Sequence, residues 1–151
     1  MATSNLIQYL SAGEAANTSN RRVVETYLTA GAVALGDWCA LDTSQTGADK
    51  ALYVTPTPAT AGRGNVVGVA IEAITGTASA PAQVKVCIAG YVAAAKVAAG
   101  TAQHASLTTS ATLGTAVTYA TGTHTATGPA GVALTAEAAG FSECFVYGRF
   151  C

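Results

Sequence analysis

From Val23 onward, the sequence consists of short runs of β-branched and aromatic residues that Gly, Pro, Thr, Ser or Asp soon interrupt. Such runs fit the pleated surface of a sheet, and turn-forming residues at these intervals leave no room for a long helix. Residues 91–102 are rich in Ala, but two valines, Gly100 and the lack of an amphipathic charge pattern favour a strand, a turn and a short helical turn at most. The chain is therefore predicted to be all-β. The expected strands are residues 23–28, 38–41, 51–55, 65–74, 83–92, 106–109, 116–119, 130–134 and 144–150.

A Gly-Val-Ala-aliphatic segment occurs twice, beginning at Gly68 and at Gly131, which are 131 − 68 = 63 residues apart. Each copy runs into a turn that ends in a glycine, and a further strand follows. A weaker echo precedes each copy, in residues 28–38 and 97–105, where a strand end, a Gly turn and a small-residue connector occur in the same order. This order predicts an internal duplication of one β unit.

Residues 1–22 differ from the rest of the chain and are predicted to form an extended N-terminal arm ahead of a β-rich domain at residues 23–151. The arm contains an apolar cluster, which is followed by polar and small residues from 11 to 20. Two interpretations stay open, a disordered tail and an arm that becomes ordered against a neighbouring subunit. The cluster consists of Leu6, Ile7, Tyr9 and Leu10.

Only 10% of the residues are charged, and the formal net charge is −1. Ordinary domains have roughly 25% charged residues, so a surface this poor in charge favours association with other proteins. Nucleic acid is not an expected partner, because the only adjacent basic pair is Arg21 and Arg22. No apolar stretch reaches the roughly 20 residues that a membrane-spanning helix needs, and no export signal is recognisable.

The four cysteines, Cys39, Cys87, Cys144 and Cys151, are widely spaced and include no Cys-x-x-Cys pair. This spacing disfavours a zinc site. Three of the four lie in apolar strand-like runs. Free, buried thiols made in a reducing cytoplasm are therefore expected, although an even count would also permit two disulfides.

The order of these segments resembles the small capsid cement (head decoration) proteins of tailed bacteriophages. In that family a strand ending in an Ala-Gly turn leads to a Gly-Asp-x-aliphatic step, which Gly36-Asp37-Trp38-Cys39-Ala40-Leu41 matches. A Gly-Val-Ala-aliphatic strand follows, matched at residues 68–76 and again at 131–140, and the chain ends on a strand, matched at residues 144–150. The resemblance covers roughly residues 23–150.

The resemblance implies a compact β-barrel or β-tulip, commonly a homotrimer, on the exterior of the virion capsid after assembly in the host cytoplasm. Such a protein binds the major capsid protein and bridges adjacent shell subunits, without catalytic activity, cofactor or metal. Low charge agrees with this role, because several modest contacts acting together bind a lattice firmly. The residues expected to contact the capsid or another subunit are Leu6, Ile7, Tyr9, Leu10, Arg21, Arg22, Tyr147 and Phe150.

Two other classes of function remain as alternatives. A carbohydrate-binding or host-adhesion module on the virion surface would use exposed aromatic side chains and the segment 111–127. An enzyme would need a constellation that the sequence lacks, because His104 and His124 lie in small-residue segments with no Cys or carboxylate nearby. Glu72 lies in an apolar strand and is expected to face solvent or an Arg across a subunit contact. The Gly62–Gly68 segment has the wrong glycine spacing for a dinucleotide loop and is expected to be a turn.

Overall fold

The computed structural model describes residues 22–58, 65–123 and 128–147, and it confirms the predicted all-β fold. Strand β8 coincides with its prediction, whereas β7 extends to Lys96 and β11 begins three residues before the predicted start at residue 144. The predicted strand 65–74 is divided into β5 and β6. The strands are β1 (Arg22–Thr29), β2 (Ala32–Val33), β3 (Trp38–Leu41), β4 (Val54–Pro56), β5 (Val66–Ala70), β6 (Ile74–Thr75), β7 (Ala82–Lys96), β8 (Ser106–Thr109), β9 (Ala116–Thr118), β10 (Gly131–Ala133) and β11 (Phe141–Val146), and one 3-10 helix, η2, spans Gly47–Ala51.

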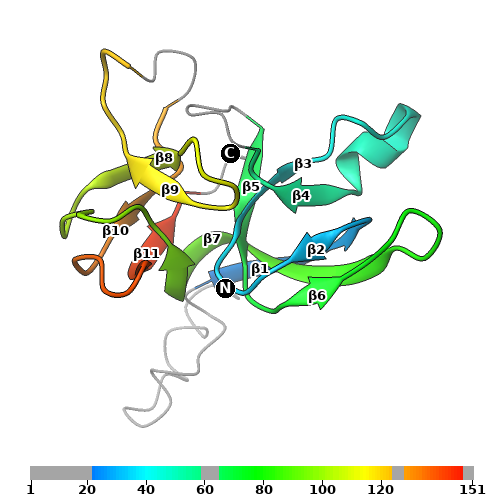
Figure 1. Ribbon diagram of the computed structural model, residues 1–151, viewed down its shortest axis with the longest axis horizontal. Helices are drawn as coiled ribbons and strands as arrows, with labels where there is room; N and C mark the ends of the chain where they lie inside the picture. The colour runs from blue at the N-terminus through cyan, green and yellow to red at the C-terminus, as the bar shows by residue number, and fades with distance from the viewer. Residues whose placement is uncertain (1–21, 59–64, 124–127, 148–151) are drawn as a thin grey trace, which may run out of the picture.

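Nine of the strands form one sheet (Figure 1). Corresponding strands follow one another in the same order when the sheet is followed inward from either edge. Reading inward, β4-β3-β5-β7 is matched by β9-β8-β10-β11, and the two halves meet where β7 pairs with β11. The first half of β7 also pairs with β1. We call β1, β3, β4, β5 and the first half of β7 the first unit, and the second half of β7 with β8 to β11 the second unit. This symmetry of pairing agrees with the predicted duplication.

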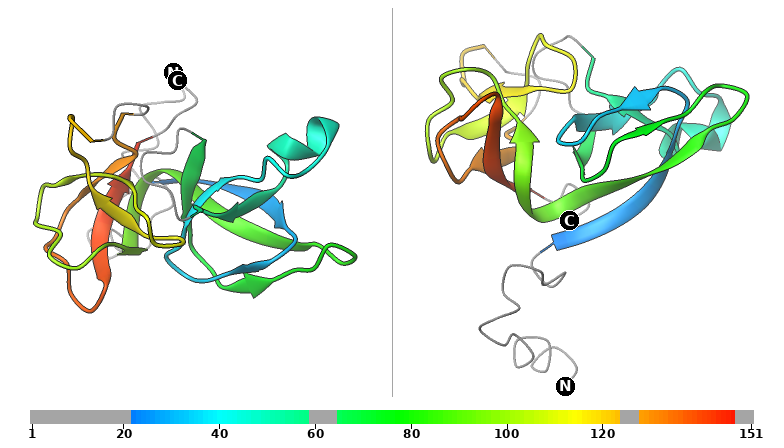
Figure 2. Two further views of the ribbon diagram at one scale, coloured as in Figure 1. Left: turned by 45° about the horizontal axis from the view of Figure 1, so that its top comes forward. Right: turned by 60° about the horizontal axis from the view of Figure 1, so that its bottom comes forward.

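Strand β7 belongs to both units, and it runs from one to the other along one side of the molecule (Figure 2). It changes partner at Gly90, which pairs with Arg22 of β1 and also with Val146 of β11. Gly90 has φ of +103°, a backbone conformation that side chains other than glycine rarely adopt. A glycine here therefore lets one strand change direction between the two units.

The domain is compact and all-β as expected, but its sheet is not closed into a barrel. The sheet ends at β4 and β9, and each of these edge strands has only three residues. Each unit is brought toward closure by a single parallel bridge, between Leu28 and Tyr53 in the first unit and between Val97 and Ala116 in the second. Edge strands this short cannot supply the continuous ladder that closure needs.

Each unit has its own apolar core, but the two cores share strands. The first core contains Cys39, Val54, Val84 and Val86 of the first unit, together with Val33 of β2. The second core is built on the second unit, yet it also includes residues from β3, β5 and the first half of β7. Strands β3 and β5 are thus buried on both faces, which explains why every residue of β5 is buried. In the first half of β7 the second core reaches only Cys87, and Gln83 and Lys85 remain exposed. The residues that the first unit contributes to the second core are Trp38, Val66, Val69 and Cys87.

The two repeated glycines occupy equivalent places. A Cβ atom on Gly68 would overlap the carbonyl oxygen of Cys87 on β7, and a Cβ on Gly131 would lie 2.7 Å from the carbonyl oxygen of Phe145 on β11. In each unit the glycine allows the central strand to approach its neighbour closely. The repeat therefore reflects the same packing requirement in both units.

Candidate functional site

An aromatic surface lies on the outer side of the second unit. Phe145 of β11 pairs with Tyr91 of β7 on one side and with Val132 of β10 on the other, so the three side chains project from the same face of the sheet. Phe145 is 44% exposed, and Tyr147, just beyond the end of β11, is 38% exposed. Their ring centroids are 6.4 Å apart with an interplanar angle of 55°. We call Tyr91, Val132, Phe145 and Tyr147 the aromatic face.

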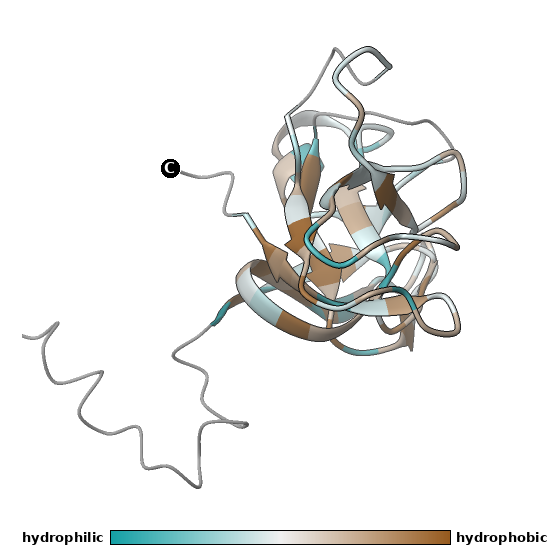
Figure 3. Ribbon diagram, turned by 90° about the vertical axis from the view of Figure 1, so that its left-hand side faces the viewer, coloured by the Kyte–Doolittle hydropathy of each residue, from teal (hydrophilic) through white to brown (hydrophobic). Residues whose placement is uncertain are grey.

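The register of β11 explains this arrangement. Its residues alternate between exposed and buried, so Phe141, Glu143 and Phe145 face outward while Cys144 and Val146 enter the second core. Seen from the side of the second unit, apolar segments lie along its strands (Figure 3).

The equivalent surface of the first unit is a packing surface. The register partners that correspond to Val132 and Phe145 are Val69 and Cys87, which pair with each other in the first unit. Both are fully buried, because this side of the first unit forms part of the second core. The same face of the sheet therefore occurs once in each unit. In the first unit this face is buried by other residues of the chain, whereas in the second unit no described residue buries Phe145.

Charges at the aromatic face are few. Partial burial, followed by the negative charge of the nearby Glu143 carboxylate, raises the pKa of Tyr91. Arg22 lies beside Gly90, at the end of this face. Burial raises the pKa of Cys87, and the positive charge of Arg22 opposes this rise. The face therefore offers apolar area with one acidic and one basic group at its margin.

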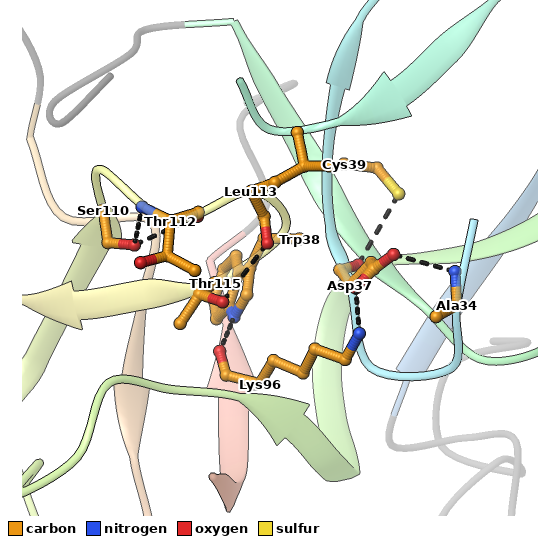
Figure 4. A network of polar contacts seen from close by, with 9 residues as sticks. All are labelled: Ala34, Asp37, Trp38, Cys39, Lys96, Ser110, Thr112, Leu113 and Thr115. Atoms are coloured by element: carbon orange, nitrogen blue, oxygen red, sulfur yellow. Dashed lines mark hydrogen bonds and ion pairs between the residues drawn. The ribbon is translucent and has the colours of Figure 1, made fainter. Parts of the chain in front are cut away.

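A partly buried polar cluster joins the two units (Figure 4). The Nζ atom of Lys96 donates to Oδ1 of Asp37 at 2.6 Å, and Oδ2 of Asp37 accepts the backbone N–H of Ala34 at 2.8 Å. The indole Nε1–H of Trp38 donates to the carbonyl of Lys96 at 3.0 Å, and the backbone N–H of Trp38 donates to the carbonyl of Gly114 at 2.9 Å. These groups are engaged with one another, so the cluster acts as a structural joint between the two units.

Two shallow pockets lie at equivalent positions in the two units. In the first unit the pocket lies between β1 and the segment before β4, and in the second unit it lies between the end of β7 and the segment before β9. The pocket of the second unit, about 420 Å³, is bordered by Lys96, Thr112, Thr115 and Phe141. The pocket of the first unit, about 350 Å³, lies beside Leu52 and β1. Each marks the place where the unit fails to close.

The described residues include two of the eight predicted contact residues. Arg22 and Tyr147 are both exposed and lie close together, because Arg22 and Val146 pair with the same glycine. Sequence reasoning missed Tyr91 and Val132, whose place beside Phe145 depends on strand register. The predicted contacts outside the described residues are Leu6, Ile7, Tyr9, Leu10, Arg21 and Phe150.

Other residues singled out in the sequence have ordinary surroundings. Glu72 forms an ion pair with Lys85 of the same chain at 3.6 Å, and its side chain is 37% exposed, in agreement with the expected solvent-facing position. His104 is an exposed turn residue with φ of 64°, and His124 lies outside the described residues. Cys39, Cys87 and Cys144 are buried free thiols, as expected, whereas Cys151 lies outside the described part of the chain.

Neither a search of protein-family models nor a search of curated proteins finds a match for this chain. Within residues 22–58, 65–123 and 128–147, no helix has the length and apolar character needed to cross a membrane. No group of three or more potential metal-ligating side chains occurs in the same ranges.

Proposed function

We propose that this chain is a non-catalytic cement protein of a phage virion, which binds the outer surface of the capsid and bridges adjacent major capsid protein subunits. The observation that carries the proposal is the aromatic face, which presents Phe145 and Tyr147 to solvent at a position that the first unit uses for packing. Exposed aromatic side chains are frequent anchors of protein interfaces.

The composition supports the same role. A surface with few charges offers little electrostatic repulsion to a binding partner. A homotrimer would present the aromatic face three times to the capsid lattice. Modest binding at each copy then becomes firm attachment, since detachment requires all contacts to break together.

Binding to undecorated heads tests the proposal. The purified protein is titrated onto heads assembled from the major capsid protein of the same phage, and bound protein is measured by sedimentation. Phe145→Ser should weaken binding about tenfold or more for each contact, since it removes an apolar anchor. Leu52→Ser is the matched control, because Leu52 is at least as exposed as Phe145, at 53% against 44%, but lies beside η2 at the other end of the molecule (Figure 1). Equal binding of wild type and Phe145→Ser would contradict the proposal.

A sugar-binding or host-adhesion module is the second candidate, because solvent-facing aromatic rings such as Phe145 and Tyr147 can also stack on sugars. A host polysaccharide pull-down separates the two proposals. A cement protein leaves the polysaccharide in solution, whereas a sugar-binding module retains it and loses it with Tyr147→Ser.

A further inference from the structure

The aromatic face lies at the point where the N-terminal segment joins the fold. Arg22, the first residue of β1, pairs with Gly90, and Gly90 precedes Tyr91 of the aromatic face. Val146 of β11 pairs with the same glycine. Partners across a ladder lie about 5 Å apart, so Arg22 is within about 10 Å of the backbone between Phe145 and Tyr147.

The segment that precedes this point has 21 residues and carries its own apolar cluster at Leu6, Ile7, Tyr9 and Leu10. Leu10 is 22 − 10 = 12 residues from Arg22. A flexible chain of that length has a root-mean-square span of about 20 Å and a maximum of about 40 Å. The cluster therefore reaches the aromatic face of its own molecule easily.

From this placement we infer that residues Leu6–Leu10 bind the aromatic face of the same molecule in the free protein. Four apolar side chains at one end of the tether match an apolar surface at the other, and neither carries a charge that would oppose contact. The tether supplies an effective concentration of the order of millimolar, far above that of a second molecule in micromolar solution.

The duplicated fold gives an independent reason for a cover at this position. In the first unit, the equivalent residues Val69 and Cys87 are buried by another part of the same chain. In the second unit, two parts of the chain outside the described residues adjoin this surface. Residues 148–151 are only four, whereas the segment before Arg22 is long enough to fold back over the surface and carries four apolar side chains. An intramolecular cover would restrict the exposure of aromatic surface until the protein meets a partner.

Photo-crosslinking of the full-length free protein tests this inference. Tyr9 is replaced by p-benzoylphenylalanine, which keeps an aromatic side chain, and the dilute protein is irradiated. Digestion and mass spectrometry then locate the cross-links, and gel mobility separates links within a molecule from links between molecules. We expect intramolecular links to residues 128–147 or to Tyr91.

Matched variants make the result specific. Phe145→Ser should lower the yield of these links about tenfold, since one apolar anchor contributes about that factor to an equilibrium constant. Phe145→Leu should keep most of the yield, and Leu52→Ser should leave it unchanged. Cross-links mainly between molecules, cross-links to other surfaces, or a yield indifferent to Phe145→Ser would each overturn the inference. Because no capsid is present, this outcome is independent of whether the protein binds a shell.

Discussion

Replacing Trp38 with Ala tests whether the two units form one cooperative structure. Trp38 belongs to β3 of the first unit, is only 1% exposed, and lies in the core of the second unit. Burying a Trp removes roughly 150–250 Å² from water, which corresponds to about 4–6 kcal/mol at about 25 cal/mol per Å². Measured Trp→Ala changes cost about 3–5 kcal/mol, and the lost indole bond to Lys96 is part of that cost. We therefore expect a loss of about 4 kcal/mol, close to the whole stability of a weak domain.

The buried thiols report on the two cores separately. Cys39 lies in the first core and Cys144 in the second, and both are 0% exposed. Native-state alkylation followed by peptide mass spectrometry measures how often each thiol becomes accessible. If the units open together, Trp38→Ala should raise both labelling rates by about a thousandfold, which is the factor for 4 kcal/mol.

Two variants serve as controls. Trp38→Phe keeps most of the packing and should raise both rates far less, and Leu52→Ser should change neither. The reasoning is refuted if Trp38→Ala accelerates labelling of Cys144 alone, because the first unit would then remain folded without the second. It is also refuted if neither rate changes.

Three further predictions concern named contacts. Gly131→Ala should destabilise the protein by about 1–3 kcal/mol in urea unfolding, because the new Cβ would lie 2.7 Å from the carbonyl oxygen of Phe145, whereas Gly122→Ala, which has open space around it, should be nearly neutral. Lys96→Met should cost about 2 kcal/mol, since it leaves the carboxylate of Asp37, which is 8% exposed, without its cation, and a second change of Asp37→Asn should recover part of the loss. Burial raises the pKa of Cys39 to about 12 and that of Cys144 to about 11, from 9.0, so the folded state prefers the neutral thiols. The contribution of the neutral thiols to the free energy of unfolding is fully present below pH 9 and should fall as the pH rises from 9 toward 11. The fall should be smaller in Cys144→Ala. A free energy of unfolding that is independent of pH across this range would contradict the argument.

Local sequence patterns predicted the class of fold and its duplication, because both depend on short-range features. Turn residues mark where strands end, and the Gly-Val-Ala repeat marks a close approach of strands that occurs once in each unit. The early start of β11 was missed because Ser142 and Glu143 look like loop residues. Ser142 is nevertheless buried, since its hydroxyl donates to the carbonyl of Thr135 at 2.8 Å.

Contacts between distant parts of the chain were not predictable in the same way. Tyr147 was expected to meet a neighbour, but its companion Tyr91 was assigned only to a strand. Tyr91 reaches Phe145 because β7 continues through Gly90, and the pairing joins residues that are 145 − 91 = 54 positions apart. Strand register over such a separation is decided by the packing of the whole sheet, not by any local pattern.

Duplication gives the chain two versions of one surface in different surroundings. The first version, around Val69 and Cys87, needs only small side chains because another unit of the same chain fills the space above it. The second version carries Phe145 at the position of Cys87, with Tyr91 beside it, and this larger apolar area remains exposed in the described structure. Leaving aromatic area in water forfeits roughly 25 cal/mol per Å², so a partner that covers this face would recover that free energy on binding. The fold thus covers one copy of this packing surface within the described chain and leaves the second copy exposed.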